Sequence, residues 1–179
     1  MKAELVIART WSGDPVAVAA QVVVAIENDA VHVAVTAHFR GDPPPPGPPC
    51  ALPGLWNFEV VELFIVGAPY HRSAPYLELE VGPFGHWLAW SFSGYREKSA
   101  EHTVTPPDVR RDVSTWEAQW RLPIAALPPG PWRVNAFAIH GPPDARVYLA
   151  ATPLGGERPD FHRVDEFVTS FVNQPTHGV

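Results

Sequence analysis

Trp56 and Glu62 are the two side chains whose types and spacing best suit the binding of a small molecule. They lie six positions apart, in a segment that leads into an expected strand over residues 57–66. Positions separated by an even number share one face of an extended chain. An indole can stack on the C–H groups of a sugar, and a carboxylate beside it can accept hydrogen bonds from hydroxyls. The alternative is a core tryptophan with a glutamate at the rim, because tryptophan more often serves packing.

Glu80 and His162 are further candidates for chemistry. Glu78 and Glu80 share a face with Tyr76 on an expected strand. If Glu62 and Glu80 converge in one concavity, repulsion between them would raise a pKa and allow proton transfer. Otherwise they are carboxylates on a solvated sheet face. His162 follows Asp160 by two positions and could be a general acid or base, or could simply hydrogen-bond to the backbone at a strand end.

The elements that must position these side chains are strands. Alternating apolar residues over 16–26, a turn at 27–30 and further alternation over 31–35 predict a β-hairpin. Further strands are expected at residues 57–66, 75–81, 86–95, 115–122, 132–140, 146–151 and 167–172, with a helical turn at 123–127. About ten strands joined by short connections predict an all-β antiparallel sandwich or jelly roll. We expect one domain over residues 1–179.

Composition excludes several other classes. The chain has 22 prolines in 179 residues, which argues against a helical bundle. The block Pro43–Pro49 is expected to be a stiff surface loop, with recognition by a proline-binding module as the alternative. The net charge of -6 argues against a nucleic-acid or anionic membrane surface. A lone Cys50 rules out an internal disulfide and a cysteine-based zinc site. Most tryptophans are expected in the core, including Trp87, Trp90, Trp116 and Trp120.

Targeting signals and cofactor motifs are not found in the sequence. Charged residues at positions 2 and 4 do not suit a signal peptide, and the apolar stretch 15–26 is shorter than the ~20 residues of a membrane span. We therefore expect a cytoplasmic protein. There is no phosphate loop, G-x-S-x-G, H-E-x-x-H or EF-hand sequence, so no metal site and no cofactor are predicted. The sequence does not indicate an oligomeric state.

Five segments occur in an order that is typical of one superfamily. They are LWNFEVVELFI at 55–65, YLELEVGPFG at 76–85, WEAQWRLPI at 116–124, WRVNAFAI at 132–139 and PDFHRVDEF at 159–167. Together they resemble the DOMON-like superfamily, which includes family 9 carbohydrate-binding modules, and within it an uncharacterised single-domain branch. The resemblance covers roughly residues 11–167. It implies a jelly-roll β-sandwich, in agreement with the strand pattern.

The resemblance also implies a set of binding residues. In the sugar-binding members two aromatic side chains sandwich a terminal sugar, while acidic, amide and basic groups bind its hydroxyls. Trp56 matches the first aromatic, Glu62 the acidic group and Asn135 a polar group on a late strand. The second aromatic, usually tryptophan, falls on Phe161, a smaller platform, with His162 beside it. Some members hold structural calcium, but no matching acidic loop is found here.

Three functions follow from these observations. The first is non-catalytic binding of a carbohydrate or another polyhydroxylated small molecule by Trp56, Glu62, Asn135, Phe161 and His162. The alternative is a stand-alone enzyme that uses Glu62, Glu80 and His162 for acid–base chemistry. A haem or electron-transfer domain, as in other DOMON-like proteins, has the least support, because the only methionine that could ligate haem is Met1.

Overall fold

The computed structural model describes residues 1–172, and within them the chain is almost entirely β-structure. Short 3-10 helices η1 (Leu55–Asn57), η2 (Ile124–Ala126) and η3 (Val164–Glu166) interrupt the strands. The strands are β1 (Lys2–Thr10), β2 (Pro15–Glu27), β3 (Ala30–His38), β4 (Val60–Gly67), β5 (Tyr76–Val81), β6 (Trp87–Gly94), β7 (Glu97–Glu101), β8 (Asp108–Arg111), β9 (Thr115–Pro123), β10 (Trp132–His140), β11 (Val147–Ala150) and β12 (Thr169–Ser170). This architecture confirms the all-β prediction.

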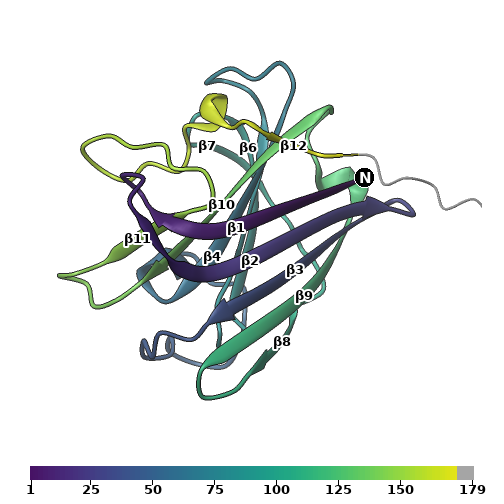
Figure 1. Cartoon of the computed structure of the whole chain (residues 1–179). Helices are drawn as coiled ribbons and strands as arrows, with labels where there is room; N and C mark the ends of the chain where they lie inside the picture. Colours follow the sequence, from purple (N-terminus) through teal and green to yellow (C-terminus); the bar gives the residue numbers. More distant parts are fainter. Residues whose placement is uncertain (173–179) are drawn as a thin grey trace, which may run out of the picture.

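The strands form one antiparallel sheet that curls into two facing layers (Figure 1). Neighbours along the sheet follow the order β7-β6-β5-β4-β10-β11-β1-β2-β3-β9-β8, and β12 pairs with β10. The β2–β3 hairpin closes through Asn28 and Asp29, which have φ values of 49° and 56°. Two consecutive left-handed residues make the turn whose twist matches that of the flanking strands, as the predicted turn at 27–30 requires.

The core lies between the two layers. Alternate residues of β4 and β5, such as Leu63 and Leu79, pack inward against β2, β3 and β9, where Val33 and Trp120 are buried. The opposite parity of β4, β5 and β10 points to the other face of the sheet. There the segment after β11 covers part of that face and forms a second buried cluster around Phe64. The uncovered remainder of this face holds the site described below.

Most predicted strands are confirmed, with several corrections. β1 was not predicted, although Leu5 and Ile7 alternate with exposed positions. Strands β7 and β8 were also missed, because every residue of β7 is exposed and β8 is largely exposed, so neither carries an apolar stripe. The strand expected from residue 57 begins at Val60, because residues 55–57 form η1. Of residues 167–172, only Thr169–Ser170 forms a strand.

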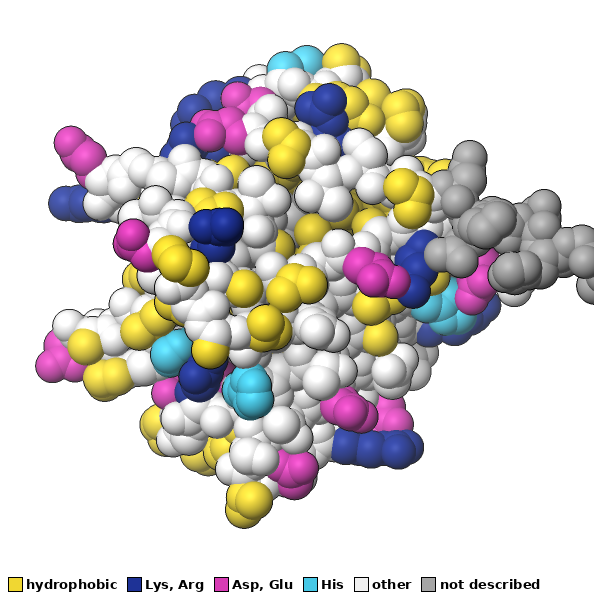
Figure 2. Space-filling model, in the orientation of Figure 1, with side chains coloured by type: hydrophobic (Ala, Val, Ile, Leu, Met, Phe, Trp, Pro, Cys, Tyr) yellow, Lys and Arg dark blue, Asp and Glu magenta, His cyan; other side chains and the backbone are white. Residues whose placement is uncertain are grey.

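The surface and the loops add three observations. The Pro43–Pro49 block has no strand or helix, as expected for a proline-rich loop. On the face shown in Figure 2, Lys and Arg side chains lie interspersed with Asp and Glu. No helix within residues 1–172 has the length and apolar character needed to cross a bilayer.

Candidate functional site

A pocket of about 420 Å³ opens on the uncovered face of β4, β5 and β6. Its floor is formed by side chains of the outward parity of these strands, and its walls come from η1, the β6–β7 hairpin and the segment after β11. The lining side chains are Trp56, Glu62, Glu78, Glu80, Trp90, Phe92, Arg96, Lys98, Ile139, Tyr148, Pro159, Phe161 and His162. A volume of this size suits a small molecule. The Pro43–Pro49 block is not among the lining residues, and Pro49 lines a separate hollow with Phe84.

Trp56 reaches the pocket from η1 and not from a strand. Gly54 begins this helix with φ of 88°, a value that favours glycine. Arg146, in the turn before β11, donates hydrogen bonds to the carbonyls of Trp56 and Phe58. Its guanidinium also lies 3.1 Å from the carboxylate of Asp42, and both side chains of that pair are about 90% buried. A nearly buried ion pair therefore fixes the backbone that carries Trp56.

Two indoles form one wall of the pocket. The rings of Trp56 and Trp90 meet edge to face, with centroids 6.0 Å apart, and Trp56 keeps 41% of its surface exposed. The ammonium of Lys98 lies 4.1 Å from the ring centre of Trp90, within cation–π range. Trp90 was expected in the core. Its place on the outward parity of β6 exposes it to the pocket instead.

Phe161 also lines the pocket but is mostly packed. Its ring stacks on Phe137 at 3.9 Å between centroids and 4° between planes, and it also contacts Trp11. One ring face is thus covered by protein, and the residue is only 7% exposed. Phe161 therefore offers little surface to a ligand, whereas Trp56 and Trp90 are more exposed.

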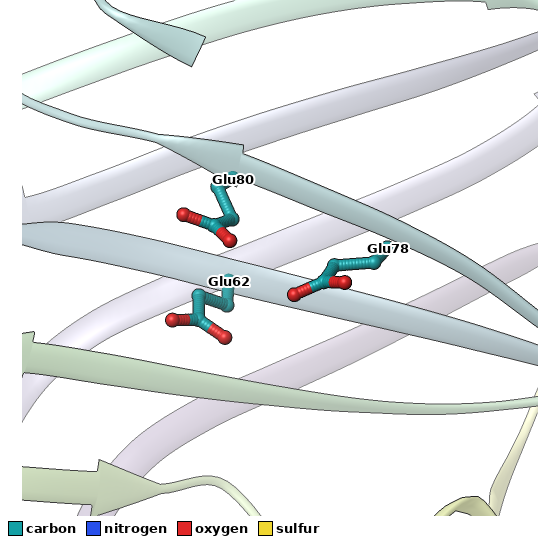
Figure 3. A group of neighbouring side chains, drawn as sticks. All are labelled: Glu62, Glu78 and Glu80. Carbon is teal, nitrogen blue, oxygen red and sulfur yellow. The ribbon is translucent and has the colours of Figure 1, made fainter. Parts of the chain in front are cut away.

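Three buried glutamates form the floor. Glu62 on β4 is the antiparallel partner of Glu80 on β5, and Glu78 lies two residues from Glu80 on the same face. Figure 3 shows the three carboxylates converging, and oxygens of all three lie within 4.8 Å of one another. Burial is the main cause that raises the pKa of each. The neighbouring carboxylates add to this effect for Glu62 and Glu80, and the pKa of Glu78 rises to about 7. The convergence of Glu62 and Glu80 that the sequence suggested is present.

His162 presents a hydrogen-bond donor to the pocket. The Tyr76 hydroxyl oxygen accepts a hydrogen bond from the backbone N–H of Arg96 at 3.2 Å and lies 2.6 Å from Nδ1 of His162. Nδ1 of His162 is the acceptor that the described residues offer to the hydroxyl proton, and when Tyr76 donates to it the neutral ring carries its own proton on Nε2. Burial and the nearby Arg96 lower the pKa of His162 to about 4, which keeps the ring neutral.

A polar clamp holds His162 in place. Asp160 accepts hydrogen bonds from the Tyr95 hydroxyl at 2.8 Å and from the Arg96 guanidinium at 2.9 Å. Tyr95 and Arg96 form the turn between β6 and β7, so the clamp joins that hairpin to the segment after β11. Asp160 also accepts from the backbone N–H of His162 at 3.3 Å. The predicted pairing of Asp160 with His162 is therefore structural, through the backbone.

Asn135 is the one predicted ligand-binding residue that does not line the pocket. It is fully buried on β10. Its Nδ2 donates to the Thr152 carbonyl at 2.8 Å, and its Oδ1 accepts from the Thr152 N–H at 3.0 Å and from the Ala136 N–H at 2.9 Å. These contacts anchor the segment that covers the sheet. The pocket brings together the other four predicted residues, Trp56, Glu62, Phe161 and His162, and adds Glu78, Trp90, Arg96 and Lys98.

Sequence comparison finds uncharacterised relatives in vertebrates. No protein-family model matches the chain. The UPF0462 protein C4orf33 homolog of Danio rerio is 36% identical over 151 residues, which cover 78% of this chain and 73% of the relative. The UPF0462 protein C4orf33 of Homo sapiens is 33% identical over 170 residues, which cover 90% of this chain and 84% of the relative.

Structural comparison finds the same fold in a solved protein. A crystal structure from Bacteroides uniformis, assigned provisionally as a carbohydrate-binding protein, matches 93% of this chain and 84% of its own with a TM-score of 0.65. The sequence identity is 14%, so this likeness shows the fold alone. A family 9 carbohydrate binding module from Caldicellulosiruptor kristjanssonii, solved with cellotriose, aligns over 74% of this chain with a TM-score of 0.43, too distant to support an argument.

Proposed function

The chain belongs to the UPF0462 protein family, and we propose that it is a non-catalytic binding protein for a carbohydrate or another polyhydroxylated small molecule. The observation that carries this proposal is the pocket over β4, β5 and β6. It combines exposed indole surface with polar groups on its floor and on its side wall. Sites for small molecules generally have apolar walls and a small number of polar groups in fixed positions.

The chemistry of each wall supports a polyol ligand. The indoles of Trp56 and Trp90 can pack against the C–H face of a sugar ring. The carboxyl groups of Glu62 and Glu78 can accept hydrogen bonds from hydroxyls, and Nε2–H of His162 can donate one. A sugar hydroxyl both donates and accepts, so it can use both sets of groups at once. The assignment to the DOMON-like superfamily is part of this proposal and agrees with the fold.

The test is a calorimetric titration with a panel of neutral mono- and oligosaccharides and polyols. We expect at least one to bind, and we expect Trp56→Ala to weaken that binding at least tenfold, because it removes the exposed stacking surface. Phe84→Ala is the matched control, since Phe84 is a partly exposed aromatic of the separate hollow, and it should bind like the wild type. Binding that survives Trp56→Ala unchanged would refute the role of this pocket.

Two further measurements address the other hypotheses. A non-catalytic protein leaves the bound glycosides intact, so turnover that is lost in Glu62→Gln would overturn the proposal in favour of the enzyme. A Soret absorption band in the purified protein would indicate haem. A cytoplasmic location stays a prediction, which fractionation of cells can test.

A further inference from the structure

The complete burial of the Glu80 carboxyl group is not explained by the proposed binding of a polyol. The Glu80 side chain has no exposed surface, and no N–H or hydroxyl group of the described residues donates a hydrogen bond to either of its carboxyl oxygens. Its polar neighbours there are the carboxyl groups of Glu62 and Glu78, and Glu78 is close enough to share a proton with it. Buried polar groups are almost always hydrogen-bonded, and an ionised Glu80 would be an uncompensated charge, which is among the costliest groups to bury. The side chain lines the pocket floor, and its oxygens lie beside those of Glu62 and Glu78, so an ion held by these two carboxyl groups would also meet Glu80.

No cationic side chain of the described protein is paired with the three glutamates of the floor. Arg96 is paired with Asp160 at 2.9 Å. Arg146 is paired with Asp42, and Lys98 is paired with Glu101 at 2.5 Å. Each of these three cations therefore already has a carboxylate partner outside the floor. The floor keeps three acidic groups together without an internal counter-ion in contact.

We propose that Glu62, Glu78 and Glu80 bind a divalent cation of the oxygen-preferring class, with Ca²⁺ as the best fit. Oxygens of all three carboxylates lie within 4.8 Å of one another. Both Ca²⁺ and Mg²⁺ prefer such oxygen ligands, but Ca²⁺ accepts an irregular arrangement at about 2.3–2.6 Å, whereas Mg²⁺ requires nearly ideal octahedral geometry at about 2.1 Å and keeps several waters. Two neighbouring strands fix the carboxylates in this arrangement, because Glu62 and Glu80 are directly paired in the sheet.

The cation would also explain how the pocket holds its ligand. Ca²⁺ takes about six to eight oxygen ligands, so three carboxylates leave several positions for water or for hydroxyl groups that enter from the pocket. Two neighbouring hydroxyls of a polyol could complete the coordination while the ring packs on Trp56. This last step rests on the proposed function, whereas the cation site stands without it.

The test uses the full chain, freed of metal with a chelator, and Ca²⁺ alone. We expect calorimetry to show one bound Ca²⁺ per chain, a higher unfolding temperature with Ca²⁺ because the ion binds only the folded site, and weaker binding of Mg²⁺. Glu80→Gln keeps the shape of the side chain and should weaken Ca²⁺ binding at least tenfold. Glu117→Gln, an exposed position on β9, is the matched control and should bind like the wild type.

The possible outcomes distinguish the proposed binding of the cation from the proposed binding of the polyol. Absence of any Ca²⁺ binding at millimolar concentration, or a folded Glu80→Gln variant that binds Ca²⁺ like the wild type, overturns the cation site. Circular dichroism of each variant establishes that it is folded. Polyol binding that needs Ca²⁺ supports the coordination step. Polyol binding that is equal with and without Ca²⁺ refutes that step and leaves the proposed function intact, while Ca²⁺ binding without any polyol binding refutes only the proposed function.

Discussion

His162 should couple the stability of the fold to pH. In the folded protein its pKa falls to about 4, first because the ring is buried and second because Arg96 lies near it, with Asp160 opposing the shift. The unfolded chain binds this proton near its ordinary value of about 6.5. Acid therefore favours the unfolded state. The stability that the neutral, buried His162 ring contributes is complete above about pH 6.5 and is lost progressively as the pH falls towards 4.

The size of the effect follows from the shift. A difference of one pKa unit corresponds to about 1.4 kcal/mol, so lowering the pH from about 7.5 to about 4 should cost about 3 kcal/mol through His162 alone. The glutamates of the floor act in the opposite direction. The pKa of Glu78 is raised to about 7, so the folded protein takes up this proton first, and falling pH between about 7 and 4.5 adds stability. The wild-type curve alone therefore mixes two opposing titrations.

The comparison with His162→Gln isolates the histidine. Glutamine can still accept a hydrogen bond from Tyr76 but does not titrate, and the floor glutamates contribute equally to both proteins. Urea unfolding followed by circular dichroism, at about pH 7.5 and about pH 4, gives the free energy of unfolding of each. The variant should gain about 3 kcal/mol relative to the wild type on going to the lower pH. A difference between the two proteins that stays constant over this range would refute the burial of a neutral His162.

Two substitutions test the supports of the site by urea unfolding, and a third is their control. Asn135→Ala should cost about 2–3 kcal/mol, because it leaves the N–H and carbonyl of Thr152 without their partner. Arg146→Ala should cost about 3–5 kcal/mol, because it leaves the nearly buried Asp42 unpaired, and it should also weaken polyol binding. Val113→Asp, at a position that is 94% exposed, should stay within about 0.5 kcal/mol of the wild type. A variant of Asn135 or Arg146 as stable as that of Val113 would contradict these roles.

Alternation in the sequence predicted the strands that bury one face, and it failed where that signal is weak or misleading. The hairpin of β2 and β3 was recognisable, because the residues of one parity next to the turn, from Val22 in β2 to Val35 in β3, are buried and the turn residues suit left-handed backbone. β7 has no buried residue, so its sequence, Glu97–Glu101, reads as a polar loop. In β1 the apolar stripe was present but was overlooked, because the exposed Val6 obscures the alternation.

The sequence predicted several residues of the candidate site, but not how the fold holds them there. Trp56 and Glu62 do share the pocket, but the argument from strand parity was wrong, since Trp56 lies on η1 and is held there by Arg146. That contact spans 90 positions in the sequence, and no local pattern can reveal it. Asn135 is polar on a strand of the right parity, yet its amide is used by the backbone of Thr152. The hydrogen-bond partners of each buried polar group separate a supporting residue such as Asn135, which is satisfied by the backbone, from Glu80, which lines the pocket without a donor among the described residues.

The pocket places acceptors and donors on different sides, and this division bears on what can bind. The floor offers carboxyl oxygens, which accept hydrogen bonds whether or not they are protonated, and which can also ligate a cation. The side wall offers Nε2–H of His162, fixed as a donor by Tyr76. A hydroxyl group can satisfy both sides, because its oxygen accepts from His162 and its proton is donated to a carboxylate. With a cation on the floor, the same oxygen would coordinate the ion. A hydroxyl-rich ligand therefore suits the site in either state, whereas an anionic group would face the acidic floor directly unless a cation were bound there.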